Sequence, residues 1–303
     1  MSVAVSFPFI MRFYLPLPIK IHVWGGLGSQ LFALALAEDL AHKFPLRNLR
    51  LVFHTGGVTY RKLEIAPLLF GFKFVIKNDF RRSNFTQHLA HLDLEESSIW
   101  KRIRLLLKKL VSLLGFFSSL NSDNDFQKCR PWIISVRGHY THRVISSYSI
   151  DRIFSRAESS GLCIPKISSS NGVVGIHYRL GDLLHLSSKN PINSDSIVRR
   201  ALSIKTEAPG VRFLLLSDST ETAKIILDRL IPLECKSFDA WSTIVVLTEN
   251  EFFIGTNSKI SQWAVIFRLY LDHNSNNFIP ATFYREVSKS IPLDIKYSNF
   301  HIV

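Results

Sequence analysis

Short apolar segments of strand length alternate with segments of helical character through most of this chain. The segments that predict strands cover residues 19–24, 49–53, 72–76, 132–136, 173–178, 211–216, 243–247 and 252–254. Those that predict helices cover residues 31–44, 101–120, 195–206, 221–230 and 261–271, and the last thirty or so residues are less regular. Strands that alternate with helices pair in parallel. The sequence therefore predicts an α/β fold.

The length and one polar segment predict two domains. At about 150 residues per domain, a chain of 303 residues has material for two. Residues 168–172, Ser-Ser-Ser-Asn-Gly, are small and polar and lie between two apolar stretches, as interdomain linkers do. We therefore expect one domain over residues 1–167 and a second over residues 173–303, with a cleft between them.

The charge balance favours an anionic partner. Lys and Arg outnumber Asp and Glu by 37 to 24, which gives a net charge of +13. A positive charge of this size attracts anionic partners, which include nucleic acid, nucleotide sugars and acidic membrane surfaces. A hydrophobic content of 47% excludes a disordered chain.

The N-terminal segment and the cysteines indicate the compartment. Residues 1–11 have no charged n-region, and Pro16 and Pro18 interrupt the next apolar stretch, so we expect neither a signal peptide nor a membrane anchor. The cysteines at 129, 163 and 235 show no Cys-x-x-Cys spacing and predict free thiols in a reducing compartment.

Gly25-Gly26-Leu27-Gly28 comes directly after the first predicted strand and precedes a helix. A glycine turn in this place lets backbone amides approach an anion at a helix N-terminus. It is not a dinucleotide fingerprint, because Leu31 occupies the third glycine's place and no acid lies between Lys43 and Tyr60. A plain tight connection between strand and helix remains the alternative.

His177 and Arg179 lie near the end of the strand predicted over residues 173–178, and Gly181 and Asp182 come just after. Alternate residues of a strand share a face, so the two basic side chains point the same way. Ligands of open α/β sheets bind at the carboxyl ends of strands, where a planar guanidinium suits a pyrophosphate. The alternative is an ion pair of Arg179 with Asp182 that stabilises the turn.

A third polar segment, residues 255–263, runs from a strand end into a helix. Its hydroxyls belong to Thr256, Ser258 and Ser261. Ser258 or Ser261 is expected to cap the helix, which leaves other N–H groups for a phosphate. A simple N-cap without a ligand remains open.

Together these segments resemble the α-1,2-fucosyltransferase family. Residues 25–32, Gly-Gly-Leu-Gly-Ser-Gln-Leu-Phe, are similar to its Gly-Gly-Leu-Gly-Asn-Gln-(Leu/Met)-Phe element. Residues 177–182 resemble its His-x-Arg-x-Gly-Asp motif, and Ser217-Asp218 its Phe-Ser-Asp-Asp element. Residues 257–263 resemble its Asn-Ser-Ser-Phe-Ser-Trp-Trp. The order and spacing of all four fit over residues 19–270.

The resemblance implies a GT-B architecture of two Rossmann-like lobes, GDP-fucose as donor, no essential metal and inversion at the anomeric carbon. Arg179 would bind the β-phosphate of the donor, Asp218 would recognise the nucleotide, and Ser258 would contact the diphosphate. His177 and Asp182 would line or shape that site and are the nearest candidates for a base. The wall that faces the sugar would consist of Gly26, Gly28 and Gln30.

This sequence departs from the family pattern at four places. Ser29 replaces the asparagine of the first element, and Ser219 replaces the second aspartate of the third. Lys259 and Ile260 replace serine and phenylalanine in the last. Ser29 is shorter than asparagine and lacks its amide donor. The departure at position 29 therefore bears on the identity of the sugar and not on the architecture.

Three further features bear on metals and membranes. Asp123-Asn124-Asp125 matches a manganese-binding Asp-x-Asp, but it lies in a polar loop with no preceding strand, and we interpret it as solvated. His88 and His91 have no evident third ligand. Residues 101–120 predict a basic amphipathic helix, which either lies on an anionic membrane that carries a lipid-linked acceptor or buries its apolar face in the first domain.

The sequence thus predicts a cytoplasmic glycosyltransferase, peripheral to the membrane at most, that moves L-fucose from GDP-fucose to a hydroxyl of a galactose-containing glycan in bacterial surface polysaccharide synthesis. Two rival hypotheses remain. One is transfer of another sugar from a GDP donor. The other is a basic protein without enzymatic activity that binds nucleic acid or anionic membrane. Two observations argue against it: the Lys and Arg residues are spread along the chain, and the sequence contains no nucleic-acid-binding motif.

Overall fold

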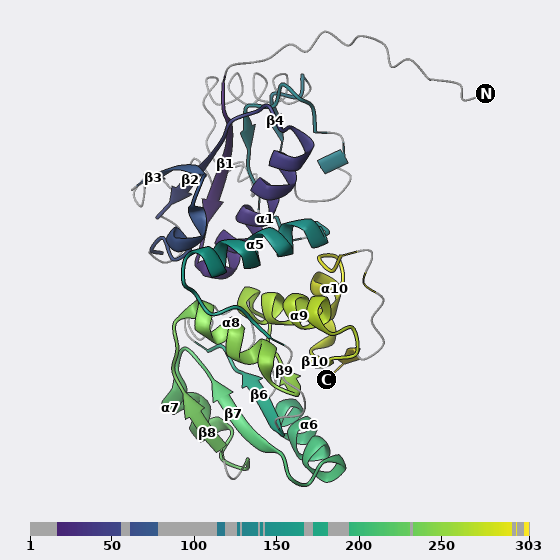
Figure 1. Cartoon of the computed structure of the whole chain (residues 1–303). Helices are drawn as coiled ribbons and strands as arrows, with labels where there is room; N and C mark the ends of the chain where they lie inside the picture. The colour runs from purple at the N-terminus through teal and green to yellow at the C-terminus, as the bar shows by residue number, and fades with distance from the viewer. Residues whose placement is uncertain are drawn as a thin grey trace, which may run out of the picture.

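The computed structural model has two lobes, one above the other in Figure 1. It describes residues 17–55, 61–77, 114–118, 126–127, 129–138, 140–141, 143–166, 172–180, 194–230, 233–292, 295 and 300–302. In this part of the chain, no helix is long and apolar enough to cross a lipid bilayer.

The first lobe contains a five-stranded sheet with the strand order β3-β2-β1-β5-β4. Its strands are β1 (Ile19–Trp24), β2 (Leu49–His54), β3 (Lys73–Lys77), β4 (Phe117–Ser118) and β5 (Ser135–Val136). Its helical elements are α1 (Leu27–Lys43), the 3-10 helix η1 (Ala66–Leu69) and α5 (Ser147–Ser159).

The second lobe contains a six-stranded sheet with the strand order β11-β10-β9-β6-β7-β8. Its strands are β6 (Val173–His177), β7 (Arg212–Leu216), β8 (Leu233–Lys236), β9 (Phe252–Ile254), β10 (Asn276–Ile279) and β11 (Phe300–Ile302). Its helices are α6 (Ser194–Glu207), α7 (Thr220–Ile226), α8 (Ala240–Glu249), α9 (Lys259–Leu271) and α10 (Ala281–Val287).

Every pairing between the described strands is parallel. The predicted fold class, α/β with two lobes in the GT-B layout, is thereby confirmed. The predicted domains, residues 1–167 and 173–303, each contain one of the sheets. The cleft between them and their division into an acceptor side and a GDP side stay predictions.

Among the described strands, each sheet has one place where the strand order reverses. In the second lobe the chain builds β6, β7 and β8 outward on one side and then returns to place β9 on the other side of β6. In the first lobe it builds β1, β2 and β3 on one side and places β5 on the other side of β1. Ligands of open α/β sheets bind outside the carboxyl ends of the strands at such switch points. The topology therefore marks two places, at β6/β9 and at β1/β5.

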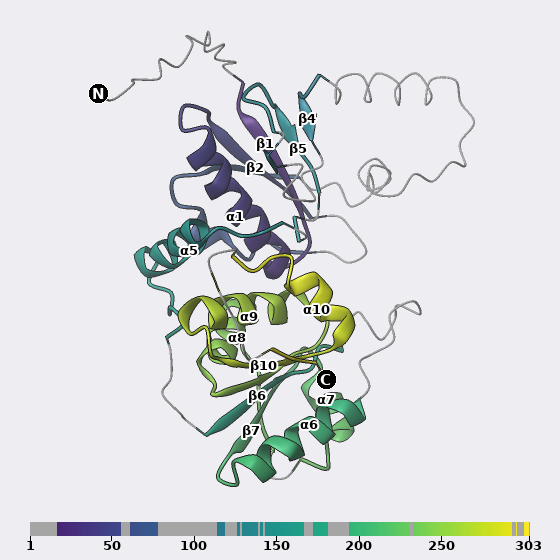
Figure 2. The same cartoon turned by 90° about the vertical axis from the view of Figure 1, so that its right-hand side faces the viewer.

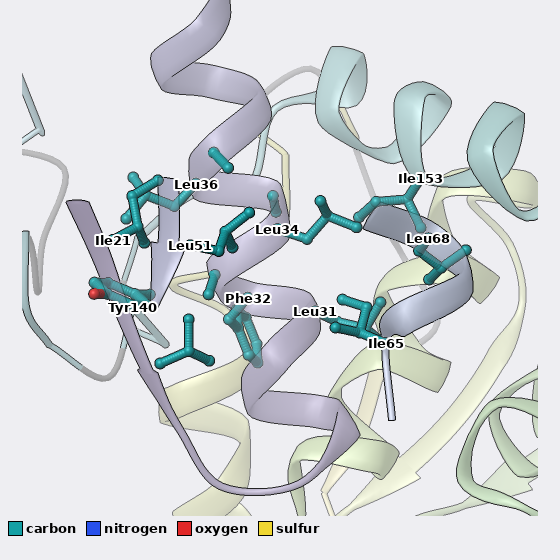
Figure 3. Close-up of a cluster of buried hydrophobic side chains, with 14 of the residues drawn as sticks. Ile21, Leu31, Phe32, Leu34, Leu36, Leu51, Ile65, Leu68, Tyr140 and Ile153 are labelled. Carbon is teal, nitrogen blue, oxygen red and sulfur yellow. The ribbon is translucent and has the colours of Figure 1, made fainter. Parts of the chain in front are cut away.

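Helix α1 is buried along most of its length. Its sequence is rich in Ala and Leu, which favour helices, and the described residues 30–40 are all buried. Figure 3 shows it between Ile21 and Leu51 of the sheet on one side and Leu68 and Ile153 on the other. A helix covered on several sides is largely apolar around its circumference, and the few polar residues that it buries need partners.

Two acids of α1 hold α5 in place. Glu38, which is 2% exposed, pairs with Arg156 of α5. Asp39 pairs with Arg143 and accepts a hydrogen bond of 2.6 Å from the Ser149 hydroxyl of α5. Buried carboxylates are tolerated when they are paired in this way.

The two lobes share an apolar core. One cluster of buried side chains contains Leu31 and Phe32 of α1 together with Trp241 of α8 and Trp263 and Phe267 of α9. Phe154 of α5 contacts the Phe267 ring edge-on, with centroids 4.8 Å apart. Figure 2 shows α5 and α1 directly above α8 and α9. The lobes are therefore joined by packed side chains as well as by the chain itself.

Two predicted elements are wrong. Residues 243–247, predicted as a strand, lie inside α8. The Asp239 side chain caps this helix by accepting from the Ser242 N–H at 2.9 Å. Tertiary packing of Trp241 and Ile244 in the shared core overrides the β propensity.

The second error concerns the end of the basic helix. Residues 114–118 form a turn and strand β4, and Gly115 has a φ of 78°, which a helix interior does not allow. Residues 101–113 lie outside the described part of the chain, so their helix stays a prediction. The last thirty residues, expected to be less regular, contain β10, α10 and β11.

Candidate functional site

His177 ends β6 at the switch point of the second sheet, and the segment after β9 lies against it. The His177 Nδ1 atom is 2.7 Å from the Ser261 hydroxyl and 3.3 Å from the Ser258 hydroxyl. His177 is 5% exposed. The switch point therefore brings together the second and third polar segments predicted from the sequence.

Burial determines the charge of His177. The pKa of His177 is lowered to about 4, chiefly by desolvation; Asp218 raises this pKa and Arg179 lowers it. Desolvation acts in this direction because it disfavours the charged imidazolium. His177 is therefore neutral at pH 7, and it holds Ser261 and Ser258 in place as a neutral hydrogen-bonding group.

Ser258 caps helix α9. Its hydroxyl accepts a hydrogen bond of 3.1 Å from the Ser261 N–H, while its own backbone is extended. The cap expected at Ser258 or Ser261 is thus Ser258. The positive end of the α9 dipole lies beside His177, so the electrostatic conditions at this switch point favour an anion.

Arg179 and Asp218 lie at the ends of neighbouring strands. Asp218, just after β7, accepts a hydrogen bond of 2.9 Å from the Leu180 N–H. The Arg179 Nε atom is 3.7 Å from an Asp218 oxygen, and both side chains are partly exposed. The backbone N–H of Arg179 donates to the Thr256 hydroxyl at 3.2 Å. This hydrogen bond connects the segment after β6 to the segment after β9.

The structure thus brings four predicted site residues, His177, Arg179, Asp218 and Ser258, to one switch point. Asp182 lies outside the described residues, so its role as a candidate base and the proposed Arg179–Asp182 pair stay predictions. Within the described part of the chain, Arg179 forms an ion pair with Asp218.

The glycine turn of the first lobe has a carboxylate of the chain beside it. Gly25 has a φ of 94°, which explains the glycine, and Gly26 is the N-cap of α1. The N–H of Leu27 donates to a Glu64 carboxylate oxygen at 3.0 Å. Part of the anion-binding capacity predicted for this helix N-terminus is therefore used by Glu64, a partner that no sequence pattern indicated.

Gln30 links α1 to the segment before η1. Its amide nitrogen donates to the carbonyls of Gly25 at 3.0 Å and Lys62 at 2.8 Å. Its amide oxygen accepts from the N–H groups of Glu64 and Ile65, both at 3.0 Å. A buried amide with four partners has its hydrogen-bonding capacity filled. The described contacts of Gln30 therefore position the loop around the glycine turn.

Gly28 brings the two lobes into contact. A Cβ added there would lie 2.6 Å from the Lys259 Cβ and 2.9 Å from its carbonyl carbon. The Trp263 indole N–H donates to the Gly28 carbonyl at 2.9 Å. Only glycine allows the first turn of α1 to approach the first turn of α9 so closely.

Two departures from the family pattern meet at this junction. The Lys259 ammonium group donates to the Ser29 hydroxyl at 2.8 Å, across the lobes. The shorter residue at position 29 is thus contacted by a longer one at position 259. Because Lys259 directly follows Ser258, this pair adds a positive charge next to the switch point of the second lobe.

No group of three or more His, Cys, Asp or Glu side chains that could hold a metal ion is present among the described residues. Asp123, Asp125, His88 and His91 lie outside them, so the interpretation of these residues stays a prediction, as does the expectation that no metal is required.

A second polar cluster, not predicted from the sequence, is formed by His22 and Trp24 of β1 and by His54 at the end of β2. The His22 Nδ1 and His54 Nε2 atoms are 2.8 Å apart. The signal in the sequence is the alternation of Lys20, His22 and Trp24 with buried Ile19, Ile21 and Val23. This alternation predicts the strand, and its polar face also marks residues that can contact a ligand.

Comparison with known proteins gave structural similarity only. No protein-family model matches the chain, and no curated protein does. Among solved structures, E. coli heptosyltransferase WaaC with ADP-2-deoxy-2-fluoro heptose is 13% identical with a TM-score of 0.45, over 95% of this chain and 93% of that one. NodZ alpha-1,6-fucosyltransferase soaked with GDP-fucose is 14% identical with a TM-score of 0.40, over 82% and 91%.

A glycosyltransferase of family 9 from Veillonella parvula is 8% identical with a TM-score of 0.41, over 86% of this chain and 80% of that one.

Proposed function

We propose that this protein is a glycosyltransferase that binds the diphosphate of a GDP-sugar at the β6/β9 switch point, with GDP-β-L-fucose as donor and a galactoside hydroxyl as acceptor. The observation that carries the proposal is the convergence of Arg179, Ser258 and the α9 N-terminus beside neutral His177. A cation and a helix N-terminus at a topological switch point suit a pyrophosphate.

The chemistry follows from the departure of GDP. The bond between the anomeric carbon and the diphosphate oxygen breaks, and negative charge grows on that oxygen. A preorganised guanidinium and aligned helix N–H groups stabilise such charge in the transition state. Arg179 is suited to this because its planar fork can hold two phosphate oxygens at once.

The remaining assignments extend the same proposal. Asp218 recognises the nucleotide, and Gly26 of the first lobe faces the sugar. The product is an α-1,2 linkage formed with inversion, in bacterial surface polysaccharide synthesis. The acceptor is lipid-linked, and residues 101–113 contact the membrane. The family resemblance supports these points, and the net charge of +13 is compatible with both the donor and an anionic membrane.

Thermal unfolding with a panel of nucleotide sugars tests the donor. GDP and GDP-fucose should stabilise the protein by about 2.7 kcal/mol at 100 times their dissociation constants. UDP-N-acetylglucosamine and ADP-heptose serve as matched controls and should not stabilise it. Stabilisation by GDP-mannose but not by GDP-fucose would show that the donor carries the proposed nucleotide with a different sugar.

Stabilisation by the UDP- or ADP-sugar alone would contradict the proposal, as would the absence of any effect. The panel is run with and without EDTA, and equal shifts are expected. If EDTA abolished transfer and manganese restored it, the reaction would need a metal ion, and Asp123 and Asp125 would be the candidate ligands.

A further inference from the structure

The first sheet has its own switch point, which the proposed donor site does not use. It lies between β1 and β5, which Figure 2 shows side by side. In the parallel register, Lys20 of β1 lies opposite Ser135 of β5, so their side chains point to the same face of the sheet. Alternate residues of a strand also share a face. His22 therefore lies on this face too, and Arg137, directly after β5, continues it.

The guanidinium of Arg137 has no partner among the described residues. Its Nε atom is buried and forms no hydrogen bond, and no other hydrogen bond or ion pair of the side chain is found in the described part of the chain. Four other described arginines also bury an Nε atom without a hydrogen bond, but each forms a hydrogen bond or an ion pair elsewhere: Arg47, Arg143, Arg179 and Arg200. A cation removed from water without a partner is unfavourable, so an anion is expected to complete it.

A second polar atom without a partner lies on the same face. Ser135 is 4% exposed, and its hydroxyl forms no hydrogen bond with the described residues. Buried polar atoms are nearly always hydrogen-bonded, to the protein, to water or to an ion. Ser135 and Arg137 thus leave two neighbouring polar groups of one strand to be satisfied by a bound group.

The charges around this face favour an anion over water as that group. Desolvation lowers the pKa of His22 to about 3, and Arg137, Lys77 and Lys20 are among the groups that lower it further, as like charges do. Burial lowers the pKa of Arg137 itself, and the group that raises it is Tyr140. No carboxylate of the described residues therefore offsets the positive charge of Arg137.

The position of Arg137 is fixed, and its side chain can be reached from solvent. The Tyr140 hydroxyl donates to the His22 carbonyl at 2.7 Å and lies 3.2 Å from the Val136 carbonyl, which holds the backbone next to Arg137 against β1. The Arg137 side chain is partly exposed although its Nε atom is buried, and Lys20 on the same face is exposed.

We propose that the β1/β5 switch point is a second anion-binding site, in which Arg137 and Ser135 bind a phosphate group. A guanidinium can hold two phosphate oxygens at once, and a serine hydroxyl can donate to another. The inference goes beyond the proposed function and does not depend on it, because the donor diphosphate is assigned to the other lobe. The phosphate belongs to a free ion or to a phosphorylated sugar, and two probes distinguish these sources.

Isothermal titration calorimetry in a phosphate-free buffer measures the binding of inorganic phosphate. Arg137→Met keeps an unbranched side chain but removes the charge and all the donors, so its dissociation constant for phosphate should be higher than that of the wild type by more than about tenfold. The control is Arg212→Met, on an exposed residue of β7, which should bind phosphate as the wild type does. Saturating GDP fills the proposed donor site, so phosphate binding that persists with GDP belongs to the first lobe.

Galactose 1-phosphate is the second probe. If the wild type binds it more tightly than inorganic phosphate and Arg137→Met removes this binding, the site takes a phosphorylated sugar. If it binds no more tightly than inorganic phosphate, the site takes the free ion.

The unpaired cation gives an independent readout in the absence of phosphate. Arg137→Met removes a desolvated charge that no carboxylate offsets, so its melting temperature should equal or exceed that of the wild type. Arg143→Met is the contrasting control, because Arg143 is buried and paired with Asp39, and its loss should lower the melting temperature. A lower melting temperature for Arg137→Met would show that its guanidinium has a partner in the protein, and it would overturn the proposal.

Ser135→Ala is a second test that does not depend on the folding of Arg137→Met. It should keep the wild-type melting temperature and weaken phosphate binding by about 2- to 10-fold. Failure of the wild type to bind phosphate beside GDP, or wild-type affinity in either variant, overturns the proposal. Failure of the proposed function has a different signature, because GDP would then not bind while phosphate would still bind in a manner that depends on Arg137.

Discussion

Replacement of Arg179 by lysine is expected to lower the rate of transfer by roughly 10²- to 10³-fold, by analogy with the loss of one preorganised donor. Lysine keeps the charge but not the planar fork that holds two phosphate oxygens at once. The fold should remain, because Arg179 is partly exposed and its ion pair with Asp218, at 3.7 Å, is a weak contribution to stability. Turnover and melting temperature are measured on the same preparation.

The matched control is Arg212→Lys, at the opposite end of the neighbouring strand β7, where no effect on turnover is expected. If Arg179 served only as a partner of Asp218, Arg179→Lys would keep most activity, and Arg179→Ala and Asp218→Ala would act mainly by lowering the melting temperature. Near-normal turnover in Arg179→Lys would remove the central residue of the donor site.

Replacement of Gly28 by alanine is expected to destabilise the protein by about 1–3 kcal/mol and to reduce transfer. The new methyl group would lie 2.6 Å from the Lys259 Cβ and 2.9 Å from a backbone carbon, so the first turns of α1 and α9 must move apart. That movement separates Trp263 from the Gly28 carbonyl and shifts Ser258, the neighbour of Lys259. Urea unfolding and single-turnover transfer report the two effects.

Gly210→Ala is the matched control for this substitution. Nothing lies within 4 Å of a Cβ added at Gly210, and its φ is not among the positive values. The variant should equal or slightly exceed the wild-type stability, because alanine restricts the unfolded chain. Equal free energies of unfolding for Gly28→Ala and Gly210→Ala would show that the lobe junction accommodates the methyl group without loss of stability. That result would contradict the close packing of Gly28 against Lys259.

The fold was predictable where local pattern and tertiary environment agree. Strand β1 has the bounds predicted from its alternation, and β2, β6 and β9 agree to within one residue at each end. Residues 243–247 were not predictable in this way, because their β-branched composition favours a strand while the Asp239 cap and the shared core impose a helix. A preference that packing overrides cannot be detected in a short window.

The candidate site was predictable as a set of strand ends. His177, Arg179, Asp218 and Ser258 lie at or just after the ends of β6, β7 and β9, and parallel pairing brings these ends together. The strand order, and with it the second switch point, was not readable from the sequence. Glu64 at the α1 N-terminus and the His22–His54 contact are long-range pairs, whose partners are 37 and 32 positions apart in the chain. Only the folded chain shows such contacts.

Hydrogen–deuterium exchange with and without saturating GDP tests the central claim most directly. Bound diphosphate should slow exchange in two segments, residues 177–180 and 256–261, because their N–H groups lie at the β6/β9 switch point. Strand β3, at the far edge of the first sheet, serves as the internal control and should exchange at the same rate in both samples. Unchanged exchange in both segments, or protection confined to another part of the chain while GDP is bound, would contradict the account.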